Sequence, residues 1–196
     1  AILLSSIYGV DIDTQAVEVS KLSLLLKVLE GETAQTIRQF GLFGERALPS
    51  LERNIRCGNS LIEPGHMKGL FTDEEERRRI NAFDWKREFP KVLAEGGFDV
   101  VIGNPPYIRI QAMQEWAPRE VELYKDLYRS ASTGNYDIYV VFVERALKLL
   151  KDEGRLGFII PQKFWQVQFG EPLRTLLADG RHVAHVTNLR NNQAFP

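Results

Sequence analysis

The stretch FDVVIGNPPYI, residues 98–108, decides how this chain is interpreted. Apolar and β-branched residues run up to Gly103, and an asparagine, two prolines and a tyrosine follow. A proline has no N–H to give to a sheet, and the residue before a proline is pushed into extended backbone. The stretch therefore predicts a buried strand over Phe98–Gly103, with Asn104 held at its carboxyl end.

Similar patterns along the chain predict alternating strands and helices. Strands are expected at Ser6–Ile12, Asn54–Cys57, Arg155–Pro161 and His182–Leu189, and helices at Ala16–Leu29, Asp137–Lys151 and Pro172–Leu177. Asp13 is placed to cap the first helix, Gly31 to end it and Gly154 to end the second. Of two polar segments, His66–Glu95 is expected to be helical, and Gln111–Arg129 is expected to be an inserted loop and helix.

Strands of continuous apolar character between helices predict an α/β fold, with a mostly parallel sheet covered by helices on both faces. The length of 196 residues suits one domain. Ligands of such sheets bind at the carboxyl ends of the strands. The residues to inspect there are Asp11, Asp13, Asn59, Ser60, Asn104–Tyr107 and Pro161–Phe164.

Composition gives weaker guidance. The formal net charge of -1 carries no signal for nucleic-acid binding. A single cysteine, Cys57, makes no internal disulfide and suits a reducing cytoplasm. No apolar run approaches the roughly 18 residues of a membrane span, so no membrane association is expected. The chain starts at Ala1 without methionine, which leads us to expect a piece of a longer protein.

Asn104 suits the alkylation of an amino group attached to a ring or a carbonyl. The lone pair of such a nitrogen is delocalised, so the nitrogen is a weak nucleophile. If the Asn104 side-chain oxygen and the Pro105 carbonyl each accept one N–H, the nitrogen can turn its lone pair toward an electrophile. Tyr107 can stack on the flat group that carries the nitrogen. We therefore expect Asn104 to hydrogen-bond an amino group, by a mechanism that needs no metal.

Two other polar residues leave alternatives open. Asp11, within the first predicted strand, either accepts hydrogen bonds from ribose hydroxyls or helps to cap the following helix. Asn59, in a Gly-Asn-Ser-Leu turn with Ser60, either accepts from an adenine amino group or only shapes the turn.

Five motifs, in this order, resemble those of S-adenosylmethionine-dependent N6-adenine DNA methyltransferases of bacterial restriction-modification and phage-defence systems. They are GVDID (9–13), GNSL (58–61), FDVVIGNPPY (98–107), YDIYVVFVERALKLL (136–150) and RLGFIIP (155–161). The resemblance implies a Rossmann-like methyltransferase fold. It also implies S-adenosylmethionine as cofactor, double-stranded DNA as substrate, and a restriction nuclease domain or subunit as a further partner.

The resemblance also implies roles for single residues. Asp11 would bind the cofactor ribose, Ile12 would pack on its adenine, and Asn59, beside Ser60, would contact the adenine amino group. Asn104, Pro105 and Tyr107 would hold the target base as catalytic residues. Phe195, in the terminal QAFP stretch, would pack against the flipped base.

The resemblance divides the chain into a cofactor half at 1–65, a polar insertion at 66–96 and a catalytic half at 97–196. Two family features do not occur in the sequence: the glycine-rich FxGxG loop before GVDID, and the DNA-reading domain. We therefore expect a catalytic domain incomplete at its N-terminus and inactive alone. Two alternatives stay open: a protein-glutamine or RNA adenine N-methyltransferase, and a non-catalytic DNA- or partner-binding fragment.

Overall fold

The computed structural model describes residues 2–30, 50–67 and 73–188. Contacts divide the chain into two compact units, residues 1–88 and 89–196. The finer division into halves at 1–65 and 97–196 stays a prediction. Within the described ranges, no helix has the length and apolar character that crossing a membrane requires.

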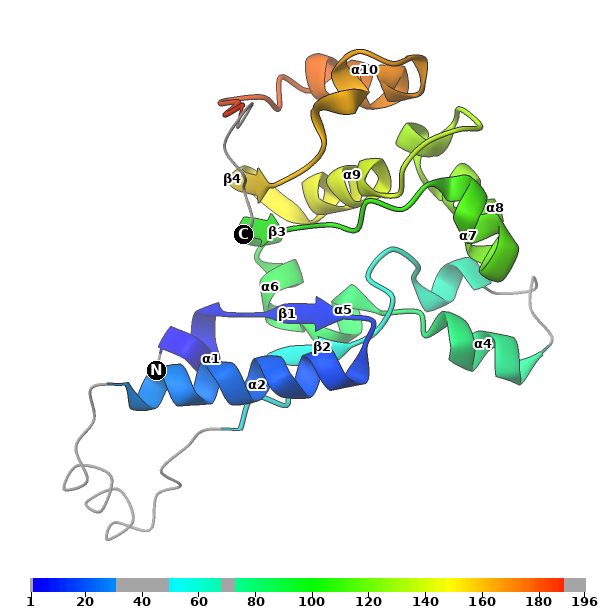
Figure 1. Cartoon of the computed structure of the whole chain (residues 1–196). Helices are drawn as coiled ribbons and strands as arrows, with labels where there is room; N and C mark the ends of the chain where they lie inside the picture. The colour runs from blue at the N-terminus through cyan, green and yellow to red at the C-terminus, as the bar shows by residue number, and fades with distance from the viewer. Residues whose placement is uncertain (1, 31–49, 68–72, 189–196) are drawn as a thin grey trace, which may run out of the picture. The chain divides into compact units, whose positions relative to one another are not determined.

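Figure 1 labels the principal elements of both units. The first unit contains α1 (Ile2–Ser6), β1 (Gly9–Asp11), α2 (Thr14–Leu29), β2 (Ile55–Cys57), η1 (Pro64–Met67), α4 (Glu74–Ile80) and α5 (Trp85–Glu88). The second contains α6 (Pro90–Ala94), β3 (Phe98–Gly103), α7 (Ile110–Trp116), α8 (Pro118–Leu127), η2 (Arg129–Ala131), α9 (Tyr139–Leu149), β4 (Leu150–Phe158), η3 (Gln162–Trp165), η4 (Gln168–Gly170) and α10 (Glu171–Asp179).

In the first unit, β1 and β2 pair in parallel and α2 packs against them. Val17 of α2 joins Leu51 and Ile55 in a small buried apolar cluster. The Asp13 side chain accepts from the backbone N–H of Gln15 at 2.7 Å, so the predicted N-cap of this helix is confirmed. The predicted end of the helix at Gly31 lies outside the described residues.

The strand predicted over Ser6–Ile12 is shorter than expected. Ser6 belongs to α1, and the strand covers only Gly9–Asp11. The Asn54 side chain donates to the Ile7 carbonyl at 2.8 Å and to the Leu4 carbonyl at 3.0 Å. These carbonyls are thus satisfied by an amide side chain and need no partner strand.

The described part of the polar segment expected at His66–Glu95 includes the end of η1 and the short helices α4, α5 and α6. Asp73 caps α4 by accepting from the N–H of Glu75 at 2.9 Å. Arg78 lies 3.5 Å from Glu74, as expected for an i,i+4 pair on an exposed helix face. The second polar segment, Gln111–Arg129, was expected to be a loop and a helix, but it contains two helices, α7 and α8.

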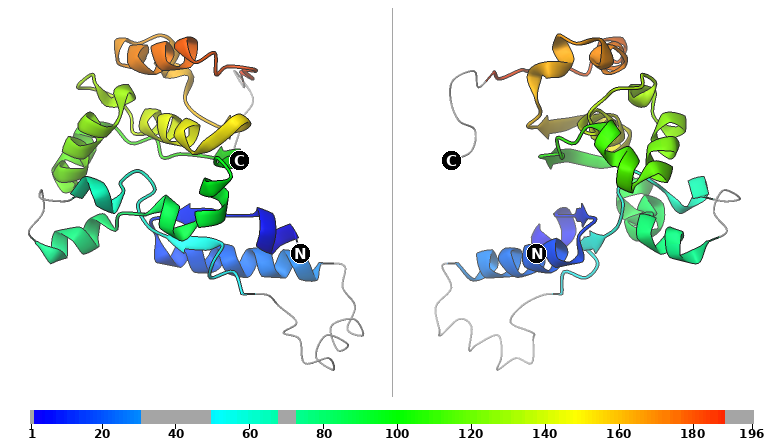
Figure 2. Two further views of the ribbon diagram at one scale, coloured as in Figure 1. Left: turned by 180° about the vertical axis from the view of Figure 1, so that it is seen from behind. Right: turned by 45° about the vertical axis from the view of Figure 1, so that its right-hand side comes forward.

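In the second unit, β3 and β4 pair in parallel, side by side in both views of Figure 2. The predicted bounds of β3 are confirmed, but the prediction that this strand is buried is wrong. Val100 is 56% exposed and Ile102 is 80% exposed. Among the described residues, β3 and β1 each have a strand partner on one edge only. Val100 and Ile102 are exposed because no other described segment packs over their side chains.

One helix end and one further strand were predicted wrongly. Gly154 does not end a helix: α9 stops at Leu149, and Gly154 lies inside β4, where an added Cβ would meet the Lys151 carbonyl at 2.9 Å and the Phe98 carbonyl at 3.1 Å. The described part of the predicted strand His182–Leu189, residues 182–188, is irregular and exposed. An apolar alternation in sequence does not supply the partner that a strand needs.

The core of the second unit is built on α9. Seven of its eleven residues are buried: Tyr139, Val140, Val141, Val143, Glu144, Ala146 and Leu149. Glu144 is the charged member, and its carboxylate accepts from the N–H of Ser130 at 2.7 Å and of Arg129 at 3.2 Å. Lys148 completes the group with an ammonium 2.8 Å from Glu144. These contacts hold α9 against η2.

Candidate functional site

The loop after β3 holds the residues that the sequence singled out first. Asn104 is exposed directly beyond the end of β3, while Pro105 is buried and anchors the loop. The N–H of Ile159 donates to the Gly103 carbonyl at 3.3 Å, so the pairing with β4 extends to the base of this loop. Asn104 therefore projects from a part of the backbone that is fixed on both sides.

Tyr107 closes the loop. Its hydroxyl oxygen lies 2.8 Å from Oδ1 of Asn104 and 2.9 Å from the carbonyl oxygen of Ile159. The side chain is 47% exposed. The hydroxyl thus ties Asn104 to the end of β4, while part of the ring stays open to solvent.

The ring of Tyr107 packs against aromatic side chains of the second unit. Tyr139 is fully buried, and its ring meets Tyr107 in a T-shaped contact with centroids 6.3 Å apart. Phe164 packs on Tyr139, and Trp165 lies 4.5 Å from Phe164 between ring centroids. The orientation of the Tyr107 ring is therefore set by the core of the second unit.

The chain path explains why Tyr139 arrives at this point. The N–H of Ile138 donates to the Ile108 carbonyl at 2.9 Å, and the N–H of Ile110 donates to the Tyr136 carbonyl at 2.9 Å. The segment just beyond the loop is thereby pinned to the segment that enters α9. Tyr139 is the first residue of that helix.

This arrangement has a definite chemical capacity. A carboxamide and a half-exposed aromatic ring lie side by side on rigid backbone. The amide oxygen can accept an N–H, and the ring can stack on a flat group that carries it. Of the three residues predicted for this function, the structure brings Asn104 and Tyr107 into direct contact and places Pro105 between them in the chain.

In the first unit, Asp11 and Ile12 lie at the carboxyl end of β1. One carboxylate oxygen of Asp11 accepts from the Asp13 N–H at 2.8 Å, and the side chain is exposed. A carboxylate has lone pairs for about four hydrogen bonds, so capacity remains for a ligand hydroxyl. Ile12 is 59% exposed and offers apolar surface beside it. That these two residues bind the ribose and the adenine of a cofactor stays a prediction.

Asn59 and Ser60 follow β2, and here the turn alternative has geometric support. Oδ1 of Asn59 accepts from the Leu61 N–H at 3.1 Å, and the residue is only 6% exposed. The Ser60 carbonyl accepts from the indole N–H of Trp85 at 3.0 Å. Contact between Asn59 and a cofactor amino group stays a prediction.

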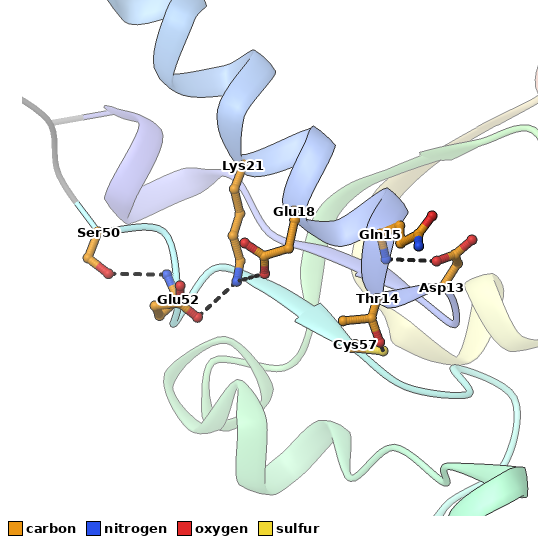
Figure 3. Close-up of polar contacts among 8 residues, drawn as sticks. All are labelled: Asp13, Thr14, Gln15, Glu18, Lys21, Ser50, Glu52 and Cys57. Carbon is orange, nitrogen blue, oxygen red and sulfur yellow. Dashed lines mark hydrogen bonds and ion pairs between the residues drawn. The ribbon is translucent and has the colours of Figure 1, made fainter.

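Polar contacts also fix the surroundings of α2, as Figure 3 shows. Lys21 reaches Glu18 and Glu52, each at 2.8 Å, and so ties the segment before β2 to the helix. These hydrogen bonds raise the pKa of the Lys21 ammonium above its ordinary value. Thr14 lies 3.4 Å from the sulfur of Cys57, across the gap between α2 and β2. These contacts hold α2 against β2, and β2 pairs with β1, the strand that ends at Asp11.

Sequence reasoning missed two parts of the site. It did not single out Tyr139, although this residue stands in the quoted motif at 136–150, nor the carbonyl of Ile159, to which no side-chain pattern points. The predicted contribution of Phe195 lies outside the described residues.

Comparison with known proteins matches residues 5–195 to the family model "Eco57I restriction-modification methylase". The chain is 37% identical over 194 residues to the type II restriction enzyme and methyltransferase RM.Eco57I of Escherichia coli, covering 99% of this chain and 18% of that protein. It is 38% identical over 104 residues to the type II methyltransferase M.PaeR7I of Pseudomonas aeruginosa, covering 52% of this chain and 17% of that protein.

A third relative is the adenine-specific methyltransferase PglX of Streptomyces coelicolor, 29% identical over 184 residues, with 87% of this chain and 14% of that protein covered. In these three relatives the matched region is less than a fifth of the protein's length.

Proposed function

The chain belongs to the Eco57I restriction-modification methylase family, and from this membership we propose that the whole protein methylates the exocyclic amino group of adenine in double-stranded DNA. The proposed methyl donor is S-adenosylmethionine, and the proposed setting is restriction-modification or phage defence. The observation that carries the proposal is the Asn104 carboxamide, held at the end of β3 beside the half-exposed ring of Tyr107.

Asn104 would act as a preorganised acceptor. Its amide oxygen would take one N–H of the target amino group, and the Pro105 carbonyl would take the other. Both acceptors belong to a loop whose two ends are bonded to Ile159, the residue after β4: the Ile159 N–H donates to Gly103, and the Ile159 carbonyl faces the Tyr107 hydroxyl. Little reorganisation is then needed when the amino nitrogen turns its lone pair toward the methyl donor.

Tyr107 would hold the base itself. A base turned out of the duplex loses its stacking partners, and the open part of the Tyr107 ring offers a replacement. Because the ring rests on Tyr139, it does not have to be ordered by the base. The binding energy of stacking is thus available for positioning the amino group.

Asp11 and Ile12 would hold the adenosine part of the cofactor, by hydrogen bonds to the ribose and by apolar contact with the adenine. Bound S-adenosylmethionine supplies a methyl group on a sulfonium, which is electrophilic enough for direct displacement. The Asn104 oxygen and the Pro105 carbonyl would keep the lone pair of the amino nitrogen directed at this methyl group. Asn59 and Ser60 complete the proposed cofactor site.

For the complete catalytic domain we propose the Rossmann-like methyltransferase fold. Two features support it: both strand pairs are parallel, and helical connections separate the strands in sequence. The strand edges of β1 and β3 that lack a partner among the described residues are the places where further strands would complete the sheet.

The proposed function is tested by single-molecule sequencing of DNA from cells that express the full-length protein. We expect N6-methyladenine at one sequence motif, and none at that motif when the expressed protein carries Asn104→Ala. Unmethylated DNA with the wild-type protein, together with transfer of label from S-adenosylmethionine to RNA or to protein glutamine, would reassign the substrate. A restriction nuclease partner is proposed because RM.Eco57I is both a restriction enzyme and a methyltransferase, and it is tested by DNA cleavage in the same cells.

A further inference from the structure

The hydroxyl of Tyr107 faces two oxygen acceptors with one proton. It lies 2.8 Å from Oδ1 of Asn104 and 2.9 Å from the Ile159 carbonyl oxygen. A phenol donates a single hydrogen bond, so one of these two short oxygen–oxygen contacts has no proton in it. The Ile159 carbonyl has no hydrogen to contribute. The Asn104 carboxamide does, on its nitrogen.

We propose that the Asn104 amide turns its Nδ2 toward Tyr107, so that Nδ2–H donates to the Tyr107 oxygen and the Tyr107 hydroxyl donates to the Ile159 carbonyl. Rotation of a carboxamide by 180° exchanges its oxygen and nitrogen in nearly the same positions. In this relay every short contact contains one proton. The Asn104 oxygen then points away from Tyr107, and the hydroxyl of Tyr107 becomes a positioning group that fixes the acceptor.

The relay has a rigid anchor. The carbonyl of Ile159 belongs to a residue whose own N–H is bonded to Gly103, in the extension of the β3–β4 pairing. The ring of Tyr107 is held by its T-shaped contact with the buried Tyr139. The Tyr107 hydroxyl is therefore held at the Ile159 carbonyl. Its oxygen then accepts from Nδ2 of Asn104, which fixes the orientation of the Asn104 amide.

The consequence rests on the proposed function. An amide held by the relay presents its oxygen to the amino group of the target base. Without the hydroxyl, the amide can present its NH₂ instead, and a donor facing a donor is repulsive. We expect the rate of methyl transfer to fall by roughly 10- to 100-fold, less than when the acceptor itself is removed.

The first test is Tyr107→Phe in the full-length protein, which keeps the ring and removes the hydroxyl. Single-turnover methyl transfer should fall by about 10- to 100-fold. The affinity for S-adenosylmethionine, and the fluorescence of a 2-aminopurine placed at the target position, should stay within about twofold because the ring is intact. Tyr8→Phe is the matched control, since it also removes a tyrosine hydroxyl, one that belongs to the first unit and donates to the Ser5 carbonyl.

A double-mutant cycle separates positioning from a general loss of structure. Asn104→Ser keeps an acceptor oxygen on a side chain too short to reach the Tyr107 hydroxyl. Adding Tyr107→Phe to Asn104→Ser should cost less than about twofold in rate, because the relay is already broken. An equal loss in both backgrounds, or an unchanged rate for Tyr107→Phe alone, overturns the relay.

A neutron crystal structure decides the relay without any activity measurement. We expect two deuterons on the Asn104 atom that faces Tyr107, and the Tyr107 deuteron directed at the Ile159 carbonyl. A Tyr107 deuteron directed at Asn104 overturns the relay even if the enzyme methylates DNA. A wild-type protein without methyltransferase activity refutes the proposed function, and the deuteron positions still decide the relay.

Discussion

Glu144 on α9 and Ser130 in η2 are joined by a 2.7 Å hydrogen bond in which the Ser130 N–H donates to the buried carboxylate. Burial by itself would raise the pKa of Glu144, but the Lys148 ammonium and the Ser130 N–H outweigh it and hold the pKa below its ordinary value. The carboxylate is therefore a structural element of the unit that carries Asn104 and Tyr107.

Glu144→Gln should destabilise this unit by about 1–3 kcal/mol at pH 7, because a charged acceptor of backbone N–H groups is lost. A pKa lowered on folding means that the stabilisation is complete above the ordinary pKa of about 4.5 and is lost as the pH falls from there toward the folded-state pKa. Urea titrations of both proteins at pH 7 and pH 4 check this. A stability difference that does not shrink at the lower pH would contradict the assignment.

For Tyr136, unlike Glu144, we predict that removing the polar group does not destabilise the protein. Its hydroxyl is buried and has no hydrogen-bond partner among the described residues, and burial raises its pKa well above the ordinary value of 10. Tyr136→Phe should leave the free energy of unfolding unchanged or increase it by up to about 1 kcal/mol at pH 7. Because the folded pKa is raised, the wild-type protein should lose stability above about pH 10 through this group, and the variant should lose less. Thermal melts at pH 7 and pH 10.5 measure both effects; a destabilised variant would reveal a partner for the hydroxyl.

Asp11 and Asp13 form a matched pair for the cofactor site. Asp11→Asn keeps an oxygen for the Asp13 N–H but loses the charge that ribose hydroxyls would meet, so the dissociation constant for S-adenosylmethionine should rise roughly 10-fold or more. Asp13→Asn keeps the helix cap, so the dissociation constant for S-adenosylmethionine should stay within about twofold of the wild-type value. Calorimetry on the full-length protein compares the two, and equal affinities would remove Asp11 from the site.

Tyr107→Ala removes both the ring and the hydroxyl. The loss should exceed that of Tyr107→Phe by roughly 1–3 kcal/mol in transition-state stabilisation, the size of one base–aromatic stack. Single-turnover rates for the two variants provide the difference. If Tyr107→Ala and Tyr107→Phe are equally slow, the ring does not stack on the base.

Local signals in the sequence were sufficient to predict where several elements begin or end. The bounds of β3 are correct because Pro105 and Pro106 forbid its continuation, and Asp13 marks the start of α2 because a carboxylate there satisfies free N–H groups. The membership in a methylase family was also readable, because the asparagine–proline–proline–tyrosine run is rare and stands at the end of a strand.

Other features depend on partners that no local pattern names. Val100 and Ile102 look like buried strand residues, yet they are exposed because pairing and cover must come from other segments. Residues 182–188 alternate in hydropathy without forming a strand. The bond from Tyr107 to Ile159 joins residues 52 positions apart through a backbone carbonyl, which carries no sequence signature.

The most direct test of the account is the single-turnover rate of methyl transfer to duplex DNA by the full-length protein with Asn104→Ala. Asn188→Ala, which removes another exposed asparagine of the same unit, is the control. We predict that Asn104→Ala lowers the rate by at least about 10²–10³-fold while the affinity for S-adenosylmethionine stays within a few-fold, and that Asn188→Ala changes neither. A rate for Asn104→Ala close to that of the wild-type protein would contradict the role of Asn104 as the acceptor of the target amino group.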